Sequence, residues 1–269
     1  MLNLELDGVR DGEQVIYFRA GGQWCYVWTP ASFRRDKPAP FVLHHHGYGG
    51  YVVEDSADWL EEGYKIDLLK AVMAAGEGCA VAGSHACGDH CGNPAGVEAG
   101  RALFETLVGL PFFDARRVGL MGGGMAGALV WNLILGPLAS RIKTVAVLQS
   151  VVSLEAFIRG QRHKWMVLQA YGLPEDAADD EAVAGVVPYD PLPRLQRLPR
   201  GTPLPRTAIY HGARDEDVVC DAHAVPLADA LRTVGGDVSL EVFPDVEHAV
   251  YDMGRSIEQR LTRFFSSAL

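Results

Sequence analysis

The stretch RVGLMGGGMAGAL, residues 117–129, decides the fold of this chain. It begins with a short apolar run, continues through three successive glycines, and ends in an apolar pattern with helical spacing. This order predicts a buried strand, a tight turn and a helix. A glycine-rich turn at a helix N-terminus exposes backbone N–H groups that can hold a negative charge. The stretch therefore predicts an α/β protein with a functional site at this turn.

The sequence on either side has the same alternation of strand and helix. Continuous apolar runs without a polar face predict strands of a parallel sheet that is covered on both faces. The predicted strands are 41–45, 79–83, 118–121, 144–148, 207–210 and 238–243. The predicted helices are 56–75, 95–108, 125–135, 220–233 and 255–267.

Two segments differ from this alternation. Runs at 2–6, 15–18 and 25–28 are separated by Asp-Gly and Gly-Gly pairs, which predicts antiparallel strands before the parallel sheet. Residues 151–205 contain no clear strand and several prolines. Because a loop of that length is uncommon inside a compact domain, we expect a helical cap at 151–205, inserted within a single domain over 1–269.

Composition limits the classes of partner. The formal net charge is −10 and the pI is about 5.3, so the chain should repel nucleic acid and anionic membrane surfaces. No apolar stretch approaches the roughly 18 residues that span a bilayer, and the first residues lack the basic start of a secretory signal. Five scattered cysteines are typical of a reducing compartment. We therefore expect a cytoplasmic protein without a nucleic-acid or membrane partner, and a homodimer is the default quaternary state.

Three further motifs follow predicted strands in a definite order. HHGYGG at 45–50 follows the first parallel strand, HGARDEDVV at 211–219 follows the fifth, and PDVEHA at 244–249 follows the last. With the turn at Gly124, the acidic Asp215 and the imidazole of His248, the chain order is turn, acid, histidine. The carboxyl ends of parallel strands meet at one edge of a sheet, so these groups should lie together.

In this order, the segments resemble the α/β-hydrolase superfamily over residues 40–269, and among its subgroups the dienelactone-hydrolase and acyl-peptidase-like esterases. The resemblance implies that Asp215 is the catalytic acid, with Asp217 as the alternative, and that His248 is the catalytic histidine. It places Gly124 where the family has its serine nucleophile in G-x-S-x-G. It also places Ala126 at the last glycine of that motif, a milder departure.

The resemblance also implies an oxyanion hole made of backbone amides. Its donors would be the N–H groups of Tyr48 and Met125, and neither depends on a serine side chain. Five further residues are candidates for the pocket wall: His46, Gly123, His85, Cys87 and Trp165. The apolar and aromatic composition of the region around Trp165 suggests an apolar or aromatic small-molecule substrate with a carbonyl group.

Two cofactor alternatives are disfavoured by the sequence. GGGMAG at 122–127 matches the glycine spacing of a dinucleotide-binding loop, but it follows the third parallel strand and no acidic residue occurs between Asp114 and Glu155. The segment SHACGDHCGNP at 84–94 contains four zinc-ligand side chains in a spacing too short for the usual paired arrangement. The segment then forms either an ordinary loop or a pocket wall with a reactive Cys87 or Cys91. We therefore predict no metal and no cofactor.

Three functions remain open for a chain with glycine at the nucleophile position. The first is an enzyme that uses His248, Asp215 and the oxyanion hole without a covalent intermediate, as a lyase, epimerase, cyclase or water-mediated hydrolase. The second is a serine esterase in which the nucleophile has been replaced. The third is a binding protein that uses the capped pocket without chemistry.

Overall fold

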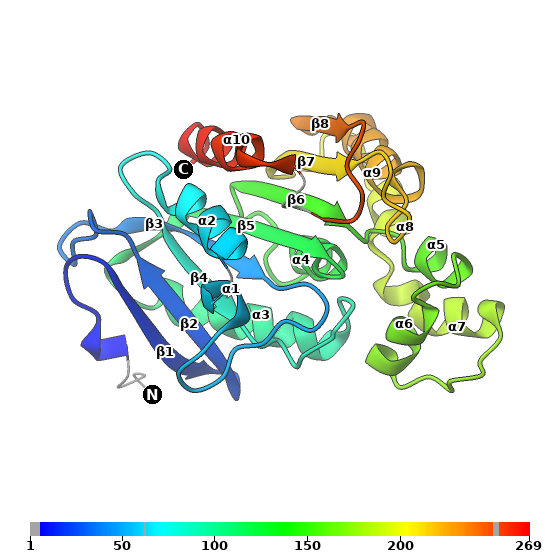
Figure 1. Cartoon of the computed structure of the whole chain (residues 1–269), viewed down its shortest axis with the longest axis horizontal. Helices are drawn as coiled ribbons and strands as arrows, with labels where there is room; N and C mark the ends of the chain where they lie inside the picture. The colour runs from blue at the N-terminus through cyan, green and yellow to red at the C-terminus, as the bar shows by residue number, and fades with distance from the viewer. Residues whose placement is uncertain (1–5, 62, 250–252) are drawn as a thin grey trace.

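A single twisted sheet forms the centre of the protein (Figure 1). The computed structural model describes residues 6–61, 63–249 and 253–269. In these residues the sheet has eight strands in the order β1-β2-β4-β3-β5-β6-β7-β8. The strands are β1 Gln14–Ala20, β2 Gln23–Thr29, β3 Ala39–His45, β4 Ala80–Ser84, β5 Phe113–Gly124, β6 Thr144–Ser150, β7 Arg206–Gly212 and β8 Val238–Phe243. The first two strands pair antiparallel, β2 pairs antiparallel with β4, and all other pairs are parallel, which confirms the predicted fold class.

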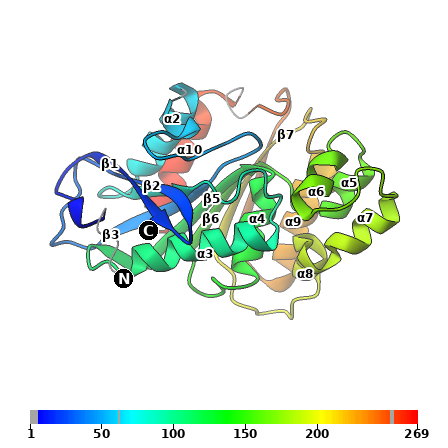
Figure 2. The same ribbon diagram turned by 90° about the horizontal axis from the view of Figure 1, so that it is seen from below.

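Helices cover both faces of this sheet (Figure 2). Helices α2 (Gly63–Met73) and α10 (Arg255–Ser266) pack together on one face. The opposite face is covered by α3 (Pro94–Val108), α4 (Ala126–Ile134) and α9 (Cys220–Val234). In the described part of the chain, no helix has both the length and the hydropathy that a membrane span requires.

The two faces have separate apolar cores. Successive strand residues point to opposite faces, so Val42 and Met121 belong to the core under α2 and α10, whereas Leu43 and Leu120 belong to the core under α3, α4 and α9. All four side chains are almost fully buried. This double burial explains why the strands appear in the sequence as continuous apolar runs.

The N-terminal strands form a hairpin. β1 and β2 are joined by Gly21-Gly22, and both glycines have positive φ, the backbone conformation of the commonest two-residue hairpin turn. Of the strand predicted at 2–6, only Leu6 lies within the described residues. Leu6 begins a 3-10 helix, η1 (Leu6–Gly8), and not a strand.

Two predicted boundaries differ from the structure. The helix predicted at 56–75 is found over Asp58–Glu61 (α1) and Gly63–Met73 (α2), and residue 62 between them lies outside the described residues. Strand β5 starts at Phe113, five residues before the predicted apolar run. Its first residues, FDARR, are mostly polar and partly exposed, so a search for continuous apolar runs misses them.

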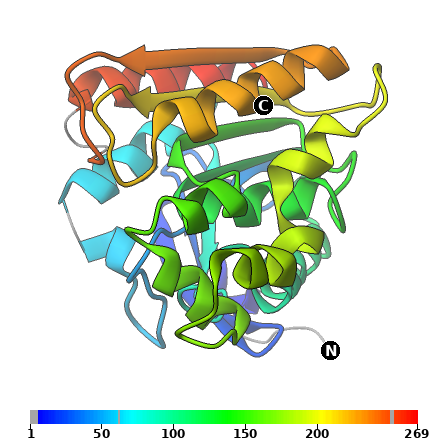
Figure 3. The same cartoon turned by 90° about the vertical axis from the view of Figure 1, so that its right-hand side faces the viewer.

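The segment 151–205 contains short helices and no sheet strand. It forms α5 (Leu154–Arg159), α6 (Lys164–Tyr171), α7 (Asp179–Val186), a 3-10 turn η2 (Val187–Tyr189) and α8 (Pro191–Gln196). Helices α5 to α7 lie beyond the carboxyl edge of the sheet, toward the viewer in Figure 3. They enclose an apolar cluster that includes Phe157 and Met166 and extends to Met125 at the turn. Helix α8 instead packs on α9, so the division into one domain with a cap at 151–205 stays a prediction.

Candidate active site

The turn between β5 and α4 is built by glycines with different structural roles. A Cβ atom at Gly122 would lie 2.8 Å from Val130 Cγ2 of helix α4, and one at Gly127 would lie 2.4 Å from Ser150 Cβ. Both contacts are closer than side-chain atoms tolerate, so glycine permits the helix to pack tightly against β5 and β6. The sharp turn itself is made at Gly124, whose φ is +54°.

Gly124, unlike Gly122 and Gly127, is not required to avoid a clash with a neighbouring side chain. Among the described residues, and apart from its chain neighbours, the only atom within 4 Å of an added Cβ would be His248 Nε2, at 3.8 Å. A side chain at this position would therefore start in open space and point toward the histidine. The backbone strain of a positive φ is the cost that a Cβ at this position would carry.

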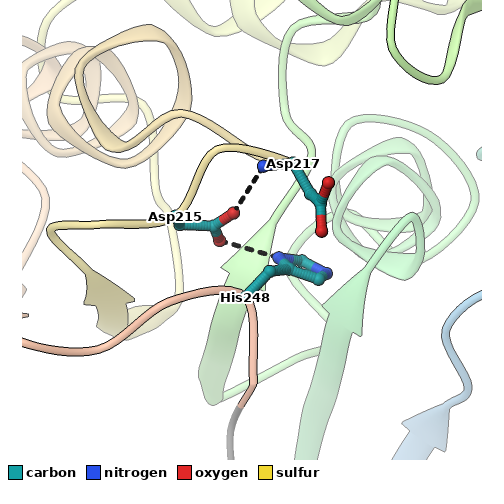
Figure 4. A group of neighbouring side chains, drawn as sticks. All are labelled: Asp215, Asp217 and His248. Carbon is teal, nitrogen blue, oxygen red and sulfur yellow. Dashed lines mark hydrogen bonds and ion pairs between the residues drawn. The ribbon is translucent and has the colours of Figure 1, made fainter.

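His248 is held by Asp215 (Figure 4). The distance from His248 Nδ1 to Asp215 Oδ2 is 2.7 Å, and Asp215 Oδ1 accepts hydrogen bonds from the backbone N–H groups of Asp217, at 3.0 Å, and Val218, at 2.8 Å. It is thus Asp215, and not Asp217, that hydrogen bonds to the histidine. Because the carboxylate accepts from Nδ1, the Nε2 atom has its lone pair directed toward residue 124 in the neutral imidazole.

The environment of Asp215 favours its charged form. Burial alone would raise the pKa of this carboxyl group, but hydrogen bonds from His211 and His248, the charge of His248 and the backbone N–H of Val218 lower its pKa below the usual value. Asp215 is therefore a carboxylate at neutral pH. A charged acid keeps the Nδ1 proton on His248 and stabilises the imidazolium that forms when Nε2 accepts a proton.

The loops that carry this pair are locked to one another. Arg214 N donates to Val246 O at 3.0 Å, and a Cβ at Gly212 would lie 2.3 Å from the same carbonyl oxygen. The buried side chain of Gln149, at the end of β6, donates from Nε2 to Glu247 O, next to His248. Gln149 has φ +48°, a backbone strain that residues at functional sites often carry.

A cavity of about 370 Å³ opens in front of the pair. Four sequence-predicted residues line it together with His248: Tyr48, Gly123, Gly124 and Met125. The remaining lining residues are Gly47, Asp58, Trp59, Tyr64, Lys65, Leu148, Gln149, Val151, Phe157, His163, Met166, Asp217, Val218 and Ala249. The two predicted oxyanion donors and the histidine thus border one space, with a mostly apolar wall beyond them.

Four other predicted pocket residues lie outside this lining in the described structure. His46 bridges two loops, with Nδ1 2.8 Å from Gly47 O and Nε2 3.0 Å from His85 O. Trp165 is exposed and packs edge-on against Tyr48, with 5.6 Å between ring centroids. Cys87 is exposed, and partial burial raises its pKa, which makes the reactive thiolate less available.

The loop after β4 does not gather a set of metal ligands. Within the described residues, the one group of three side chains whose ligating atoms lie within 4.8 Å of one another is Asp215, Asp217 and His248. In that group, Asp215 Oδ2 and His248 Nδ1 already hydrogen bond to each other. Figure 4 shows this arrangement as an acid–histidine pair with a second carboxylate beside the ring.

Two side-chain contacts in the same cavity, an ion pair and a histidine–carboxylate contact, were missed by the sequence analysis. Lys65 Nζ lies 3.1 Å from Asp58 Oδ2, and His163 Nε2 lies 3.0 Å from Asp217 Oδ1. Asp217 could be noticed because it lies two residues after Asp215, but His163 is an isolated histidine in a helical segment. Its approach to the site depends on how α5 to α7 fold over the sheet edge.

Comparison with known families agrees with this geometry. Residues 101–269, more than half of the chain, match the model described as the prolyl oligopeptidase family. The chain belongs to the prolyl oligopeptidase family. This assignment confirms the predicted α/β-hydrolase superfamily and a protein of hydrolase type. The matched region includes the Gly124 turn, Asp215 and His248 of this prolyl oligopeptidase family member.

Solved structures show the same fold at low identity. Oligopeptidase B from Leishmania major is 14% identical with a TM-score of 0.72, over 95% of this chain and 36% of its own. A prolyl endopeptidase is 16% identical with a TM-score of 0.68, over 94% of this chain and 39% of its own. Dipeptidyl peptidase 4 from Porphyromonas gingivalis is 15% identical with a TM-score of 0.68, over 97% of this chain and 36% of its own. This prolyl oligopeptidase family member therefore spans less than two fifths of these proteins, and no curated protein matches it.

Proposed function

We propose that this protein is an enzyme that acts on a small carbonyl compound without forming a covalent intermediate. Gly124 occupies the nucleophile position, and Asp215 and His248 provide the base. The N–H groups of Tyr48 and Met125 provide the oxyanion hole. The observation that carries the proposal is the 3.8 Å distance between His248 Nε2 and the Cβ position of Gly124. The imidazole of His248 is therefore placed to act as a base, although Gly124 has no side-chain nucleophile.

The chemistry follows from these groups. His248 Nε2 can take a proton from the carbon next to a substrate carbonyl, or from a water molecule that attacks that carbonyl. In either case negative charge develops on the carbonyl oxygen, and backbone N–H donors at a helix N-terminus stabilise it. Elimination, epimerisation, cyclisation and water-mediated hydrolysis all begin with one of these two steps.

We expect the substrate to bind inside the cavity and not on the outer surface of the protein. A volume of about 370 Å³ accommodates a small molecule, and Trp59, Phe157 and Met166 provide apolar and aromatic wall. We therefore infer an apolar or aromatic carbonyl compound. The protein would act in the cytoplasm without a nucleic-acid or membrane partner, and as a homodimer by default.

A serine esterase whose nucleophile has been replaced is the second candidate. One observation favours it: among the described residues beyond its chain neighbours, a Cβ added at residue 124 has only His248 Nε2 within 4 Å, so the space there admits the first atom of a side chain. Peptidase relatives with the same fold give this candidate further support.

The two candidates differ in how they respond to His248→Gln and Gly124→Ser. Turnover of carbonyl compounds, supplied as a panel of esters, thioesters, β-hydroxy and α-chiral carbonyls, should be measured for the native chain and both variants. Non-covalent chemistry predicts native turnover that His248→Gln abolishes and Gly124→Ser does not improve. A native chain that is inactive on the entire panel, with strong ester hydrolysis in Gly124→Ser, would instead support the replaced nucleophile. Native turnover that is unchanged in His248→Gln would overturn both.

A further inference from the structure

A second histidine lines the cavity, from the side of the helices beyond the sheet edge. His163 is the N-cap residue of α6, and its Nε2 lies 3.0 Å from Asp217 Oδ1. The same oxygen lies 3.3 Å from Arg162 Nε. The ring of Phe157 stacks on the His163 ring with centroids 5.7 Å apart and an angle of 25° between planes. The imidazole is therefore fixed both in plane and at one nitrogen.

The two histidines are held in the same manner. Asp215 and Asp217, two residues apart on one loop, each hold one imidazole, His248 through Nδ1 and His163 through Nε2. In each ring the second nitrogen remains for other partners: among the described residues, no protein group hydrogen bonds to His163 Nδ1 or His248 Nε2. The His163 side chain keeps 27% of its surface exposed, and both residues line the 370 Å³ cavity.

Asp217 is in addition close to the first pair. One of its oxygens lies within 4.8 Å of a ligating nitrogen of His248, and Figure 4 shows its carboxylate beside that ring. The charged groups facing His163 are thus Asp217 and Arg162, with Glu216 paired to Arg162 at 3.3 Å on the outer side. Asp217 holds the His163 ring through Nε2, which leaves Nδ1 as the nitrogen that can exchange a proton with a bound substrate.

We propose that His163 and Asp217 form a second acid–base pair, so that the cavity holds two imidazoles for one substrate. This inference rests on the proposed function and specifies its reaction class. His248 takes the proton from the carbon next to the carbonyl. Protonated His163 gives its Nδ1 proton either to a departing hydroxyl group on the neighbouring carbon, which leaves as water, or to the opposite face of the same carbon. The two histidines then return to their starting forms by proton exchange with solvent.

The substrate class follows from this pairing. A carbonyl compound with a hydroxyl leaving group on the next carbon, or with a stereocentre beside the carbonyl, needs one proton removed and another delivered. Hydrolysis through a serine nucleophile needs only one histidine, because the same ring first accepts the serine proton and then donates a proton to the leaving group. The second pair therefore favours elimination or epimerisation over hydrolysis.

Alkylation of the 269-residue chain by phenacyl bromide tests this inference without knowledge of the substrate. The reagent carries an aromatic ring and a carbonyl group, and it alkylates neutral imidazole nitrogens that face the cavity. Sites and rates are read by peptide mass spectrometry over a range of pH. Because the exposed thiol of Cys87 would react first, the experiment uses a Cys87→Ser background. There we expect one label per chain, on His248 in some molecules and on His163 in others, because a label on either ring fills the cavity that both line. Buried His223 should remain unlabelled.

Two variants separate an acid–base pair from a structural contact. In Asp217→Asn, the ratio of His163 to His248 labelling should change several-fold, since the carboxylate that holds the His163 imidazole is lost, whereas His248 remains held by Asp215. The matched control is Asp179→Asn, which removes a carboxylate paired with Lys164 of α6 and should leave this ratio unchanged.

The outcomes distinguish this inference from the proposed function. Labelling of His248 without His163 would overturn the second pair and leave the proposed function standing. The second pair is equally overturned if Asp217→Asn leaves the ratio of His163 to His248 labelling unchanged, or if Asp179→Asn changes it by the same amount. A chain in which His248 is not labelled would overturn the proposed function itself.

Discussion

The Nε2 atom of His248 lies 3.8 Å from the position where a side chain of Gly124 would begin. The hydroxyl of a serine at this position would extend from that point toward the nitrogen, within the range of a hydrogen bond. The structure thus keeps the distance that a nucleophile and its base require, although the chain has no nucleophile there.

Gly124→Ser should create an esterase that depends on His248. With p-nitrophenyl acetate as substrate, we expect the rate of Gly124→Ser to fall by about 10²–10⁴-fold when His248→Gln is added, because the serine loses its general base. Gly124→Ala, which adds the same Cβ without a hydroxyl, is the matched control and should show no gain. Equal rates with and without His248 would mean that the two groups do not work together.

The two glycines of the turn should differ in their tolerance of a side chain. Gly124→Ala should lower the free energy of unfolding by about 1–2 kcal/mol, the strain of a positive φ. Gly127→Ala should cost more, because its Cβ would lie 2.4 Å from Ser150 Cβ and 2.6 Å from Val151 O, and the backbone must shift. Urea unfolding of both variants measures the difference. A larger loss in Gly124→Ala would show that the space at residue 124 is not open.

Asp215 should stabilise the fold only above acidic pH. Its pKa is lower in the folded chain than the usual value of about 3.9 in an unfolded one, so its contribution is complete above the unfolded pKa and is lost as the pH falls through the folded pKa. Below about pH 4, the unfolding free energy of the native chain should therefore decline more steeply than that of Asp215→Asn. Guanidinium titrations at pH 7, 5, 4 and 3 test this, and parallel curves would contradict it.

His45 should make the fold sensitive to mild acid. It is fully buried, neither ring nitrogen has a hydrogen-bond partner among the described residues, and desolvation lowers its pKa to about 3. The unfolded chain binds a proton below about pH 6.5 and the folded one does not, so stability is lost as the pH falls from 6.5 toward 3. Relative to His45→Met, the native chain should lose about 2 kcal/mol of unfolding free energy between pH 7 and pH 5.

The comparison of His45→Met with the native chain isolates one group, because the other buried histidines with lowered pKa, His44, His90 and His223, are present in both. Urea titrations at pH 7, 6 and 5 give the two curves. If the native chain and the variant lose stability in parallel, His45 accepts a proton without unfolding.

Part of the site could be predicted because the residues that form it lie in short sequence motifs. The glycine turn, the acid and the histidine each follow a strand directly, and the edge of a parallel sheet brings such positions together whatever the loops do in detail. The resemblance favours Asp215 as the acid over Asp217, although both follow the same strand closely. The loop geometry, in which Asp215 is buried and its Oδ1 accepts two backbone N–H groups, agrees with Asp215 as the partner of His248.

Other parts depend on tertiary contacts that the sequence does not encode locally. His163 reaches the cavity because α5 to α7 pack over the sheet edge, and no spacing relates it to Asp217, 54 residues later. The same packing explains the errors of prediction at the pocket wall. Trp165 lies two residues after His163 on α6, but its ring packs on Tyr48 and does not belong to the cavity lining, and neither does Cys87.

The measurement that tests the central claim most directly is labelling with a fluorophosphonate, read by intact mass, of the native chain, Gly124→Ser and Gly124→Ser with His248→Ala. If His248, Asp215 and the amides of Tyr48 and Met125 are assembled around residue 124, the native chain gains no adduct, Gly124→Ser gains one, and the double variant loses it. An adduct on the native chain would reveal another nucleophile. The absence of an adduct on Gly124→Ser would contradict an intact acid, histidine and oxyanion hole at this turn.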